Sequence, residues 1–531
     1  MQSDLERSLW MDFPVPRYAP LDADTRADIC VVGGGIAGLT TAYMLAKEGA
    51  KVIVLEAGSI GSGETGRTTA HLSNALDDRY TELERVHGVA GARIAAESHC
   101  AAIDRIEAIV REEGIECMFS RLDGFLFRGE HAEPDILERE LAAAWRAGLS
   151  GLTLPDESAA TALGLGQALR FPGQGQFHPM RYLAGLARAI EARGGRICGD
   201  TRVARVDDGS PARAATTRGH TVTAESVVVA TNSPISDRLA IHTKQAAYRT
   251  FAIAIALGSA DMPRGLFWDT EDPYHYVRAH VRIDGRRVLI VGGEDHKTGQ
   301  ANDAPVRFAR LEAWTRERFR GLGPVEYRWS GQVLEPVDHL AFIGRDPAAS
   351  HVYIATGDSG HGMTHSTIAG MLITDLILGR ENPWAELYSP ERKSAKSLGT
   401  YAKENLNVAR MYGDYLKRGD VADVDDIAPG VGAIVRNGAK LLAVYRDEEG
   451  TLTARSAVCT HVGCIVRWNA TETSWDCPCH GSRFDVQGNV LNGPARAPLA
   501  AAELEEAEEE GEDESRPRQP EDRDRPRPPQ P

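Results

Sequence analysis

The sequence predicts an α/β protein in which a nucleotide-binding domain with an inserted mixed sheet precedes a small all-β domain. Three observations predict this fold class. A strand, a glycine turn, a helix and a second strand follow one another within residues 28–55, as in a βαβ unit. Strand-like runs, among them the apolar residues 288–291, occupy residues 248–293. Short strands with Gly and Asn turns occupy residues 427–499.

The length of 531 residues exceeds what one hydrophobic core usually organises, so several domains are expected. Helical patterns are expected over residues 79–129 and from Pro179 to Gly194-Gly195. The predicted divisions are an N-terminal arm (1–26), the nucleotide-binding domain with its inserted substrate subdomain (27–390), a helical connector (391–426), the small β domain (427–499) and a disordered acidic, Pro-rich tail (500–531).

The formal net charge of -16 comes in large part from the tail, where residues 503–524 include twelve acidic side chains. No basic run with interleaved aromatic residues suggests a nucleic-acid surface. No apolar run approaches the roughly 18 residues needed to cross a bilayer, and the first residues lack the apolar core of a signal peptide. We therefore expect no transmembrane segment and a cytoplasmic location.

Four of the eight cysteines lie within twenty-one residues, in the boxes Cys459-Thr-His461-Val-Gly-Cys464 and Cys477-Pro-Cys479-His480. In a cytosolic chain such clustering favours metal binding over a disulfide framework. A [2Fe–2S] cluster with two thiolates on one iron and two imidazoles on the other needs one Cys and one His from each of two loops. A tetrahedral zinc site is the alternative, because Cys and His at such spacings also hold Zn²⁺.

These boxes resemble Rieske proteins, particularly the cytochrome bc type. The resemblance implies four cluster ligands, which are Cys459, His461, Cys477 and His480. It also implies a disulfide between Cys464 and Cys479 that clamps the two loops. Ser482 matches the serine that hydrogen-bonds a cluster sulfur in the high-potential members, whereas Phe484 stands where those members have a tyrosine donor. The resemblance therefore implies a potential below that of the respiratory group.

The segment Gly33-Gly-Gly35-Ile36-Ala37-Gly38 follows the first strand and opens the helix, and Glu56 ends the second strand eighteen residues after Gly38. The glycines allow a tight turn and a close approach of a pyrophosphate to the helix N-terminus, while the carboxylate can accept the ribose hydroxyls. This full context is typical of a Rossmann-type dinucleotide-binding unit.

Three further segments, residues 61–71, 227–232 and 357–364, resemble the D-amino-acid oxidase and sarcosine oxidase superfamily, and the resemblance spans about residues 28–379. It implies that the dinucleotide is FAD. The FAD contacts that it implies outside the glycine turn are Arg67, Thr68, Thr69, Ala70, His71, Val203, Ala230, Thr231, Gly357, Gly360, His361, Gly362, Met363 and Thr364.

Two histidine-containing sites have alternative interpretations. His71 is a candidate for covalent attachment to the flavin, as in relatives with a histidine in this loop, or a loop residue without that role. A mononuclear iron triad, as in a Rieske oxygenase, is an alternative interpretation of Asp358, His361 and His365, although their spacing does not match that family.

Together, the two resemblances imply a bacterial family of amino-acid-oxidase-like flavoproteins that carry a Rieske domain. The implied function is an FAD-dependent oxidoreductase that takes a hydride from the C–H bond beside nitrogen in a small amine or amino-acid derivative. The electrons then pass singly through the [2Fe–2S] cluster to an external one-electron acceptor. The alternatives are a reductase with the opposite flow, which feeds a redox partner, and a non-enzymatic redox sensor.

Candidate substrate contacts lie on one strand, where alternation puts Tyr274, Tyr276 and Arg278 on the same face. Ordinary sheet packing is the alternative for this face. Amino-acid-specific relatives often clamp the substrate carboxylate with an arginine in a Trp-x-Gly-x-Arg-Pro segment. The comparable stretch, residues 329–336, contains no arginine, which argues against a simple amino acid as the substrate.

Overall fold

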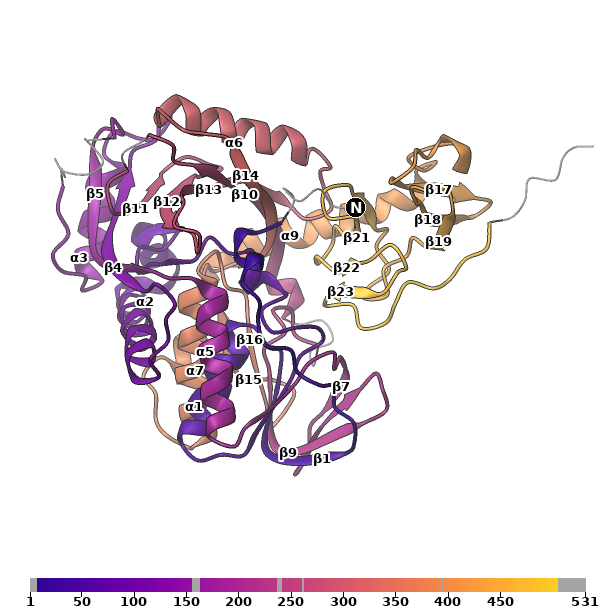
Figure 1. The fold of residues 1–531 in the computed structure, drawn as a ribbon, viewed down its shortest axis with the longest axis horizontal. Helices are drawn as coiled ribbons and strands as arrows, with labels where there is room; N and C mark the ends of the chain where they lie inside the picture. Colours follow the sequence, from indigo (N-terminus) through magenta and orange to yellow (C-terminus); the bar gives the residue numbers. More distant parts are fainter. Residues whose placement is uncertain (1–6, 155–162, 236–240, 260–261, 394, 505–531) are drawn as a thin grey trace, which may run out of the picture.

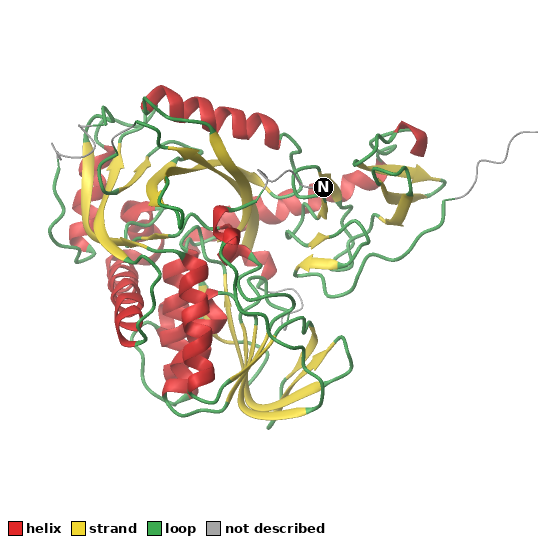
Figure 2. Ribbon diagram, viewed as in Figure 1, coloured by secondary structure: helices red, strands yellow, loops and turns green. Residues whose placement is uncertain are grey.

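The computed structural model describes residues 7–154, 163–235, 241–259, 262–393 and 395–504. Figure 1 shows a large body of helices and two sheets, with the C-terminal β domain beside it. The body contains a helical layer next to the first sheet, while the second sheet curves above it (Figure 2). The disordered tail predicted from residue 500 is wrong for its first residues, because Ala501 bridges to Arg455 and the carbonyl of Ala500 accepts the backbone N–H of Ser456 at 2.8 Å. The rest of the predicted tail, residues 505–531, lies outside the described residues. Within the described ranges, no helix combines the length and the apolar character that a membrane span requires.

The first sheet is the core of the nucleotide-binding domain. Its central strand β1 (Thr25–Val32) pairs in parallel with β2 (Val52–Leu55) and β9 (Thr221–Val229), and the last four residues of β1 are buried. The strand order is β15-β16-β9-β1-β2-β6, with β7 and β8 attached beside β9. The remaining strands are β6 (Arg196–Cys198), β7 (Val203–Asp207), β8 (Ala212–Thr216), β15 (Phe342–Arg345) and β16 (Val352–Thr356).

Three helices lie side by side against this sheet (Figure 1). They are α1 (Ile36–Lys47), α5 (Pro179–Ala192) and α7 (Gly362–Ile377). The buried side chains of α1 include Leu39, Ala42 and Tyr43, which recur at helical spacing and pack into the main core. The predicted βαβ unit and the helix from Pro179 are confirmed.

The second sheet is inserted between parts of the nucleotide-binding domain and is mixed, as predicted. Its order is β14-β10-β13-β12-β11-β4-β5-β3, in which β4 and β11 pair in parallel. The helix α6 (Ala304–Arg318) packs on β10 and β13. The strands are β3 (His71–Leu72), β4 (Ser120–Phe127), β5 (Ala168–Gln176), β10 (Gln245–Ala256), β11 (Leu266–Asp269), β12 (Tyr276–Val281), β13 (Arg287–Lys297) and β14 (Val325–Pro336).

The helix predicted over residues 79–129 is wrong in its last part. The helix α2 (Arg79–Glu112) is kinked at Gly88, whose φ is +73°, and β4 follows it. Gly124 of β4 pairs with Phe171 on one side and with Leu266 on the other. The strand is therefore selected by partners distant in the sequence, which override the local pattern. A further helix, α3 (Ile136–Arg146), packs against α2.

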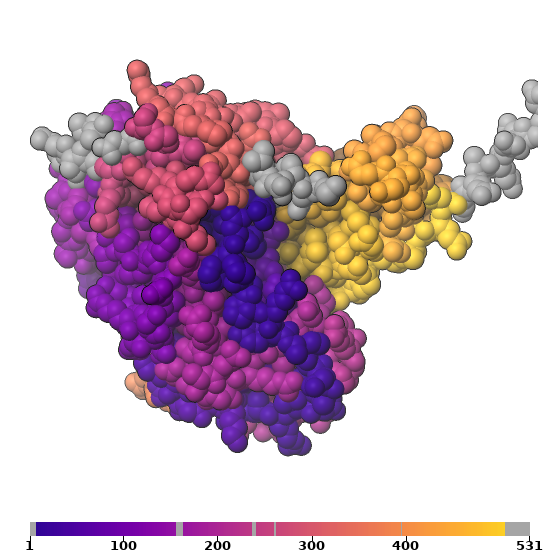
Figure 3. All heavy atoms as spheres, viewed as in Figure 1, coloured from indigo at the N-terminus to yellow at the C-terminus, as the bar shows by residue number. Residues whose placement is uncertain are grey.

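The N-terminal arm is packed into the body. Figure 3 shows the indigo N-terminal residues lying along the surface of the body. In the short helix η1 (Leu9–Asp12), Trp10 is fully buried, and its indole N–H donates to the carbonyl of Thr68 at 2.6 Å. The arm therefore supports the loop that was predicted to contact FAD.

The C-terminal region is all-β, as predicted, and follows the helices α8 (Ala385–Tyr388) and α9 (Leu398–Met411). Gly419 and Val421 bridge to Val435, so residues before 427 already lie against these strands. A three-stranded sheet contains β17 (Gly432–Asn437), β18 (Lys440–Arg446) and β19 (Leu452–Ser456). A four-stranded sheet contains β20 (Arg467–Asn469), β21 (Ser474–Asp476), β22 (Arg483–Phe484) and β23 (Val490–Asn492).

The helix α9 lies between the two parts and contacts both. Glu404 pairs with Lys297 of the second sheet, and Asn405 donates to the carbonyl of Thr243 at 3.1 Å. Just after α9, the hydroxyl of Tyr412 donates to the carbonyl of Val462 at 2.6 Å. The connector therefore ties the cysteine-containing loops to the body.

Candidate functional site

The glycine turn between β1 and α1 leaves no room for side chains. A Cβ at Gly33, where φ is +112°, would lie 2.3 Å from the carbonyl oxygen of Ala230, and one at Gly38 would lie 1.9 Å from that of Gly33. The backbone of the turn can therefore approach a ligand closely, with the N-terminus of α1 behind it. This geometry fits a dinucleotide pyrophosphate.

Glu56 lies at the end of β2, next to the glycine turn. Its carboxylate accepts the backbone N–H of Gly34 at 2.6 Å and that of Gly58 at 2.9 Å. Burial raises the pKa of Glu56, and these two N–H groups oppose the shift. The side chain also borders the cavity described next, where its remaining acceptor capacity suits ribose hydroxyls.

A cavity of about 730 Å³ runs from this turn to the second sheet, within the range of about 300–1,000 Å³ that is usual for ligand sites. Most of the predicted FAD contacts border it. They are Gly33, Gly35, Ile36, Ala37, Glu56, Arg67, Thr68, Thr69, His71, Val203, Ala230, Thr231, Gly357, Gly360, His361, Gly362 and Met363.

Three of the predicted FAD contacts lie behind the cavity wall. Gly38 packs on Gly33, the carbonyl of Ala70 faces Arg278, and the hydroxyl of Thr364 lies 2.9 Å from Nδ1 of His99. These residues shape the wall without bordering the cavity.

The loop residue His71 borders the cavity. Its Nδ1 lies 3.0 Å from the hydroxyl of Thr69, while its Nε2 is buried without a hydrogen-bond partner in the described part of the chain. Burial lowers the pKa of His71 to about 3, so the ring is neutral. A neutral ring is compatible with both interpretations of this residue, and its covalent role stays a prediction.

The three predicted substrate contacts separate into two environments. Tyr274 and Tyr276 border the cavity, with their ring centroids 5.4 Å apart. Arg278 does not border it. Its guanidinium donates to the carbonyl of Ala70 at 2.6 Å and lies 5.3 Å from the ring centroid of Trp10. Arg278 therefore stabilises the loop that contains Ala70 and does not face the cavity.

At the second-sheet end of the cavity, three acidic residues were not predicted from the sequence, which are Asp77, Asp295 and Glu335. Asp77 accepts the hydroxyl of Tyr274 at 2.6 Å and lies 3.1 Å from Nε2 of His361. Burial raises the pKa of Asp295 to about 7. Burial and the nearby carboxylates of Asp78 and Asp295 raise the pKa of Glu335 to about 8. The only sequence signal for these acids was Glu335, which lies in the segment where amino-acid-specific relatives carry an arginine.

The iron triad considered for Asp358, His361 and His365 is wrong, because the three side chains do not converge. His361 pairs with Asp77, whereas the two nitrogens of His365 contact the carbonyl of Asp358 at 2.8 Å and His99 at 3.2 Å. Among the described residues, the three do not form a group whose ligand atoms could share one metal ion.

The two cysteine boxes form facing loops, one after β19 and one after β21. The side chains of Cys459 and Cys477 hydrogen-bond to each other, which lowers the pKa of Cys459 and raises that of Cys477. Backbone N–H groups of His461 and Val462 also donate to the sulfur of Cys459. The sulfurs therefore lie together, in a setting that favours a thiolate at Cys459.

The two histidines meet on the same side of these loops. The ring centroids of His461 and His480 are 5.0 Å apart, at an interplanar angle of 85°. Burial lowers the pKa of His480 to about 3, so its imidazole is neutral, as a metal ligand requires. Nδ1 of His480 is buried without a hydrogen-bond partner in the described chain. The four side chains thus fit the cluster that was predicted for them.

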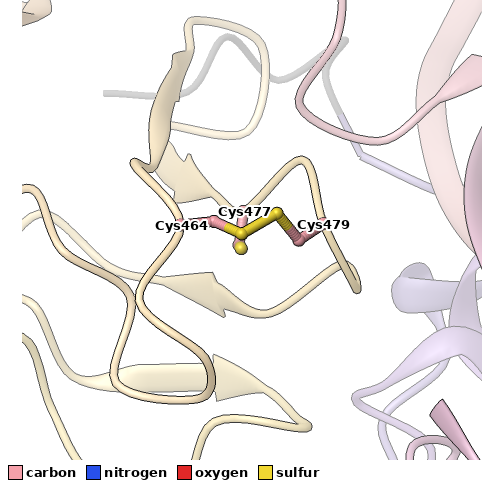
Figure 4. Close-up of side chains that lie close together, drawn as sticks. All are labelled: Cys464, Cys477 and Cys479. Atoms are coloured by element: carbon pink, nitrogen blue, oxygen red, sulfur yellow. A yellow bond between two sulfur atoms is a disulfide. The ribbon is translucent and has the colours of Figure 1, made fainter. Parts of the chain in front are cut away.

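The disulfide implied by the resemblance is present between Cys464 and Cys479. Figure 4 shows this bond with Cys477 beside it, and the three sulfurs lie within 4.8 Å of one another. A sulfur in a disulfide is not a thiolate, so this triplet is not a metal site in itself. Cys459 and Cys477 are the free cysteines of the two boxes.

Ser482 contacts a predicted cluster ligand, and Phe484 follows two residues later on β22. The hydroxyl of Ser482 hydrogen-bonds the sulfur of Cys459 and accepts the backbone N–H of Ala495 at 3.0 Å. Phe484 is fully buried on β22, where it pairs with Trp475. The serine donor is therefore in place, and the phenylalanine offers no second donor.

A buried ionic cluster joins the two domains. Glu472, in the turn between β20 and β21, is 8% exposed and lies 3.1 Å from Arg249, which is 2% exposed. It also lies 3.2 Å from Arg483 and 3.5 Å from Arg67, and it accepts the hydroxyl of Ser330 at 2.7 Å. Although burial opposes the shift, these arginines lower the pKa of Glu472.

The cluster loops contact the cavity wall directly. Nε2 of Gln332, which borders the cavity, donates to the carbonyl of Gly481 at 3.1 Å. The ring of His461 lies 5.2 Å, centroid to centroid, from that of His242 in the body. One side chain therefore separates the residue after His480 from the cofactor cavity.

Comparison with known proteins gives two family matches. The family described as FAD dependent oxidoreductase matches residues 28–376, and the Rieske [2Fe-2S] domain matches residues 417–503.

Individual relatives agree with this division. The chain is 32% identical over 495 residues to the putative Rieske 2Fe-2S iron-sulfur protein YhfW of Bacillus subtilis (strain 168), covering 92% of this chain and 96% of that protein. It is 29% identical to gamma-glutamylputrescine oxidoreductase of Escherichia coli (strain K12), covering 68% of this chain and 87% of that protein. Glycine oxidase from Geobacillus kaustophilus has a similar fold, with a TM-score of 0.58 at 20% identity over 70% of this chain and 99% of that one.

Proposed function

The chain belongs to the FAD dependent oxidoreductase family and ends in a Rieske [2Fe-2S] domain, and from this premise we propose that it oxidises a small amine and passes the electrons singly to an outside acceptor. Its cofactors are FAD and a [2Fe–2S] cluster, which replaces the zinc alternative. The chain is an oxidoreductase enzyme, so the alternative of a non-enzymatic redox sensor is set aside. The substrate, the direction of flow and the acceptor belong to the proposal.

The observation that carries the amine proposal is the charge at the second-sheet end of the cavity. Asp295 and Glu335 border this end, together with Asp77, whose charge His361 balances. The arginines that border the cavity are Arg67, Arg202, Arg483 and Arg496, and their contacts lie at the dinucleotide end or with the Rieske domain. In the described lining, the acidic end therefore has no lysine or arginine.

An ammonium group suits this end. Asp295 and Glu335 form no ion pair in the described chain, so they can pair with a positive charge of a ligand, and aromatic rings border the same region. A substrate carboxylate would meet these acids and no arginine. This supports an amine over a simple amino acid and agrees with the missing arginine of residues 329–336.

When bound in this cavity, FAD would supply the hydride acceptor for the carbon beside nitrogen, and a cluster held by Cys459, His461, Cys477 and His480 would supply one-electron transfer. The amine thus loses two electrons and two protons to become an imine, and two successive one-electron acceptors take the electrons. The contact of Gln332 with the carbonyl of Gly481 supports transfer between the two sites within one chain. A plain oxidase, which passes both electrons to dioxygen, has no need of such a contact.

The test mixes the anaerobic protein with compounds of equal chain length that carry an amine, an amine with a carboxylate, or a carboxylate alone. We expect the amine to bleach the flavin fastest and a Rieske EPR signal to appear with the bleaching. His480→Ala should still bleach but give no such signal, because it lacks a cluster ligand.

Two results would overturn the proposal. Bleaching by reduced pyridine nucleotide or by a reduced protein partner, with none by amines, would favour the reversed flow. Bleaching by amines without reduction of the cluster would refute the route through the Rieske domain. A cytoplasmic location stays a prediction, which cell fractionation tests.

A further inference from the structure

The wall of the FAD cavity is built from both domains. Most of it comes from the oxidoreductase domain, but Glu472, Arg483 and most of residues 490–496 also border the cavity. We call residues 490–496 the covering segment. Figure 3 shows the yellow domain that contains this segment in direct contact with the body.

The covering segment lies beside the dinucleotide turn. A Cβ at Gly493 would lie 3.4 Å from the Cβ of Ser233, which follows the end of β9. The carbonyl of Ala230, also at the end of β9, is the group that excludes a side chain at Gly33. The covering segment therefore reaches the carboxyl ends of β1 and β9, where dinucleotides bind in this type of sheet.

Asn492 connects the covering segment to the second FAD loop. Its Nδ2 donates to Oε1 of Glu64 at 3.0 Å, and Oε2 of Glu64 accepts the backbone N–H of Gln332 at 2.7 Å. Glu64 opens the short helix η2 (Glu64–Arg67), which Arg67 ends. One amide side chain thus joins the Rieske domain to the loop that borders the cofactor.

Arg496 adds a positive charge to this wall. It donates to the carbonyl of Ile235 at 3.3 Å, and no carboxylate in the described chain pairs with it. Arg483, on the same wall, is already paired with Asp476 and Glu472. FAD carries a diphosphate, so an arginine without an acidic partner at the cavity wall suits it electrostatically.

We propose that the Rieske domain completes the FAD site, with the covering segment and its side chains Asn492 and Arg496 holding the dinucleotide in the oxidoreductase domain. Retention of FAD then depends on docking of the second domain as well as on the Rossmann unit. The proposal goes beyond the proposed function, because it concerns retention of the cofactor and holds for any substrate that reduces it.

The first test compares Arg496→Glu with Lys440→Glu in the full-length, FAD-loaded protein. Lys440 is an exposed cation of the same domain outside the cavity, so both variants make the same change of charge. We expect Arg496→Glu and Asn492→Ala to release FAD faster, by roughly tenfold for the charge reversal, as measured by flavin fluorescence after dilution. Lys440→Glu and Arg496→Lys should behave like the wild type, and the visible spectrum of the cluster checks the fold of the domain.

The second test needs no variant. Hydrogen–deuterium exchange of the full chain with and without FAD should show protection of residues 490–496, while residues 440–446 remain unchanged. If Arg496→Glu also loses its [2Fe–2S] cluster, this exchange measurement on the wild type tests the proposal without that variant. Wild-type release of FAD by both Arg496→Glu and Asn492→Ala, or no protection of the covering segment, would overturn the proposal.

Discussion

At one end of the cofactor cavity Glu472 is buried among three arginines, whereas at the other end Asp295 and Glu335 form no ion pair in the described chain, although Arg307 and His339 lie near them. Burial raises the pKa of all three acids, but only at Glu472 do arginines reverse the shift and keep the carboxylate charged. The comparison teaches that burial alone does not identify a functional acid. A buried acid that forms ion pairs with arginines can hold two domains together. A buried acid without an ion pair is suited to a cationic ligand.

The largest expected effect comes from breaking the paired end with Glu472→Gln. This leaves Arg249, which is 2% exposed, without its carboxylate, and breaking a buried pair costs about 3–5 kcal/mol. Denaturant unfolding should show a loss of this size, and trypsin should cleave the connector faster. Glu449→Gln, an exposed change in the same domain, is the control. Equal stability of the two variants would refute a structural role for the ionic cluster around Glu472.

Substitutions at Asp295 and Glu335 should change ligand binding and leave the stability of the protein unchanged. Asp295→Asn and Glu335→Gln each remove a charge that faces the substrate, so the amine should bind roughly 10–100-fold more weakly, in line with about 1.5–3 kcal/mol for a bond to a charged group. FAD content should be unchanged. Asp284→Asn, at an exposed turn of the same sheet, should leave binding intact. An unaltered affinity for the amine in both cavity variants would contradict the assignment.

The pH dependence of binding sharpens the comparison. Asp295 and Glu335, with pKa values of about 7 and 8, hold protons below these values and are charged above them. A quaternary ammonium inhibitor, whose own charge does not titrate, should therefore bind more weakly as the pH falls through about 8 to about 7, by up to roughly tenfold per unit for one coupled proton. Titration calorimetry at several pH values measures this. The double variant Asp295→Asn, Glu335→Gln should give a flat profile.

The smallest effect is expected at the [2Fe–2S] cluster of the Rieske domain. Phe484→Tyr places a hydroxyl near a cluster thiolate, and a hydrogen bond there stabilises the reduced state, so the midpoint potential should rise by on the order of tens of millivolts. Protein-film voltammetry measures the potential. Phe484→Leu, which adds no donor, serves as the control. A potential that stayed the same or fell in the tyrosine variant would mean that the hydroxyl points elsewhere.

The sequence predicted the parts whose chemistry depends on residues close together in the chain. The glycine turn, Glu56, the two cysteine boxes and the disulfide all belong to short motifs, and the structure brings each motif together as expected. The glycine turn and Glu56 follow from local backbone geometry, whereas the ligand set and the disulfide between the two boxes were implied by the resemblance to Rieske proteins.

The rest depends on contacts between distant segments. Asp77, Asp295 and Glu335 come from three separate segments, and only the folded second sheet makes them neighbours. Strand β4 looked helical because its pairing with β5 and β11 lies far along the chain. Tyr276 and Arg278 alternate on β12 as predicted, yet Trp10 from the arm and the carbonyl of Ala70 hold Arg278 outside the cavity. No local pattern contains this information.

The braced connector has a consequence for the speed of electron passage. Glu404 and Asn405 contact the body from α9. After α9, Tyr412 and Tyr415 donate to the carbonyls of Val462 and Gly463, which follow the predicted cluster ligand His461. Because these contacts hold both cofactor sites, we expect a tunnelling distance set by the fold and no domain swing before each electron transfer. Solvent viscosity, which slows a swinging domain, would then leave the internal transfer rate unchanged.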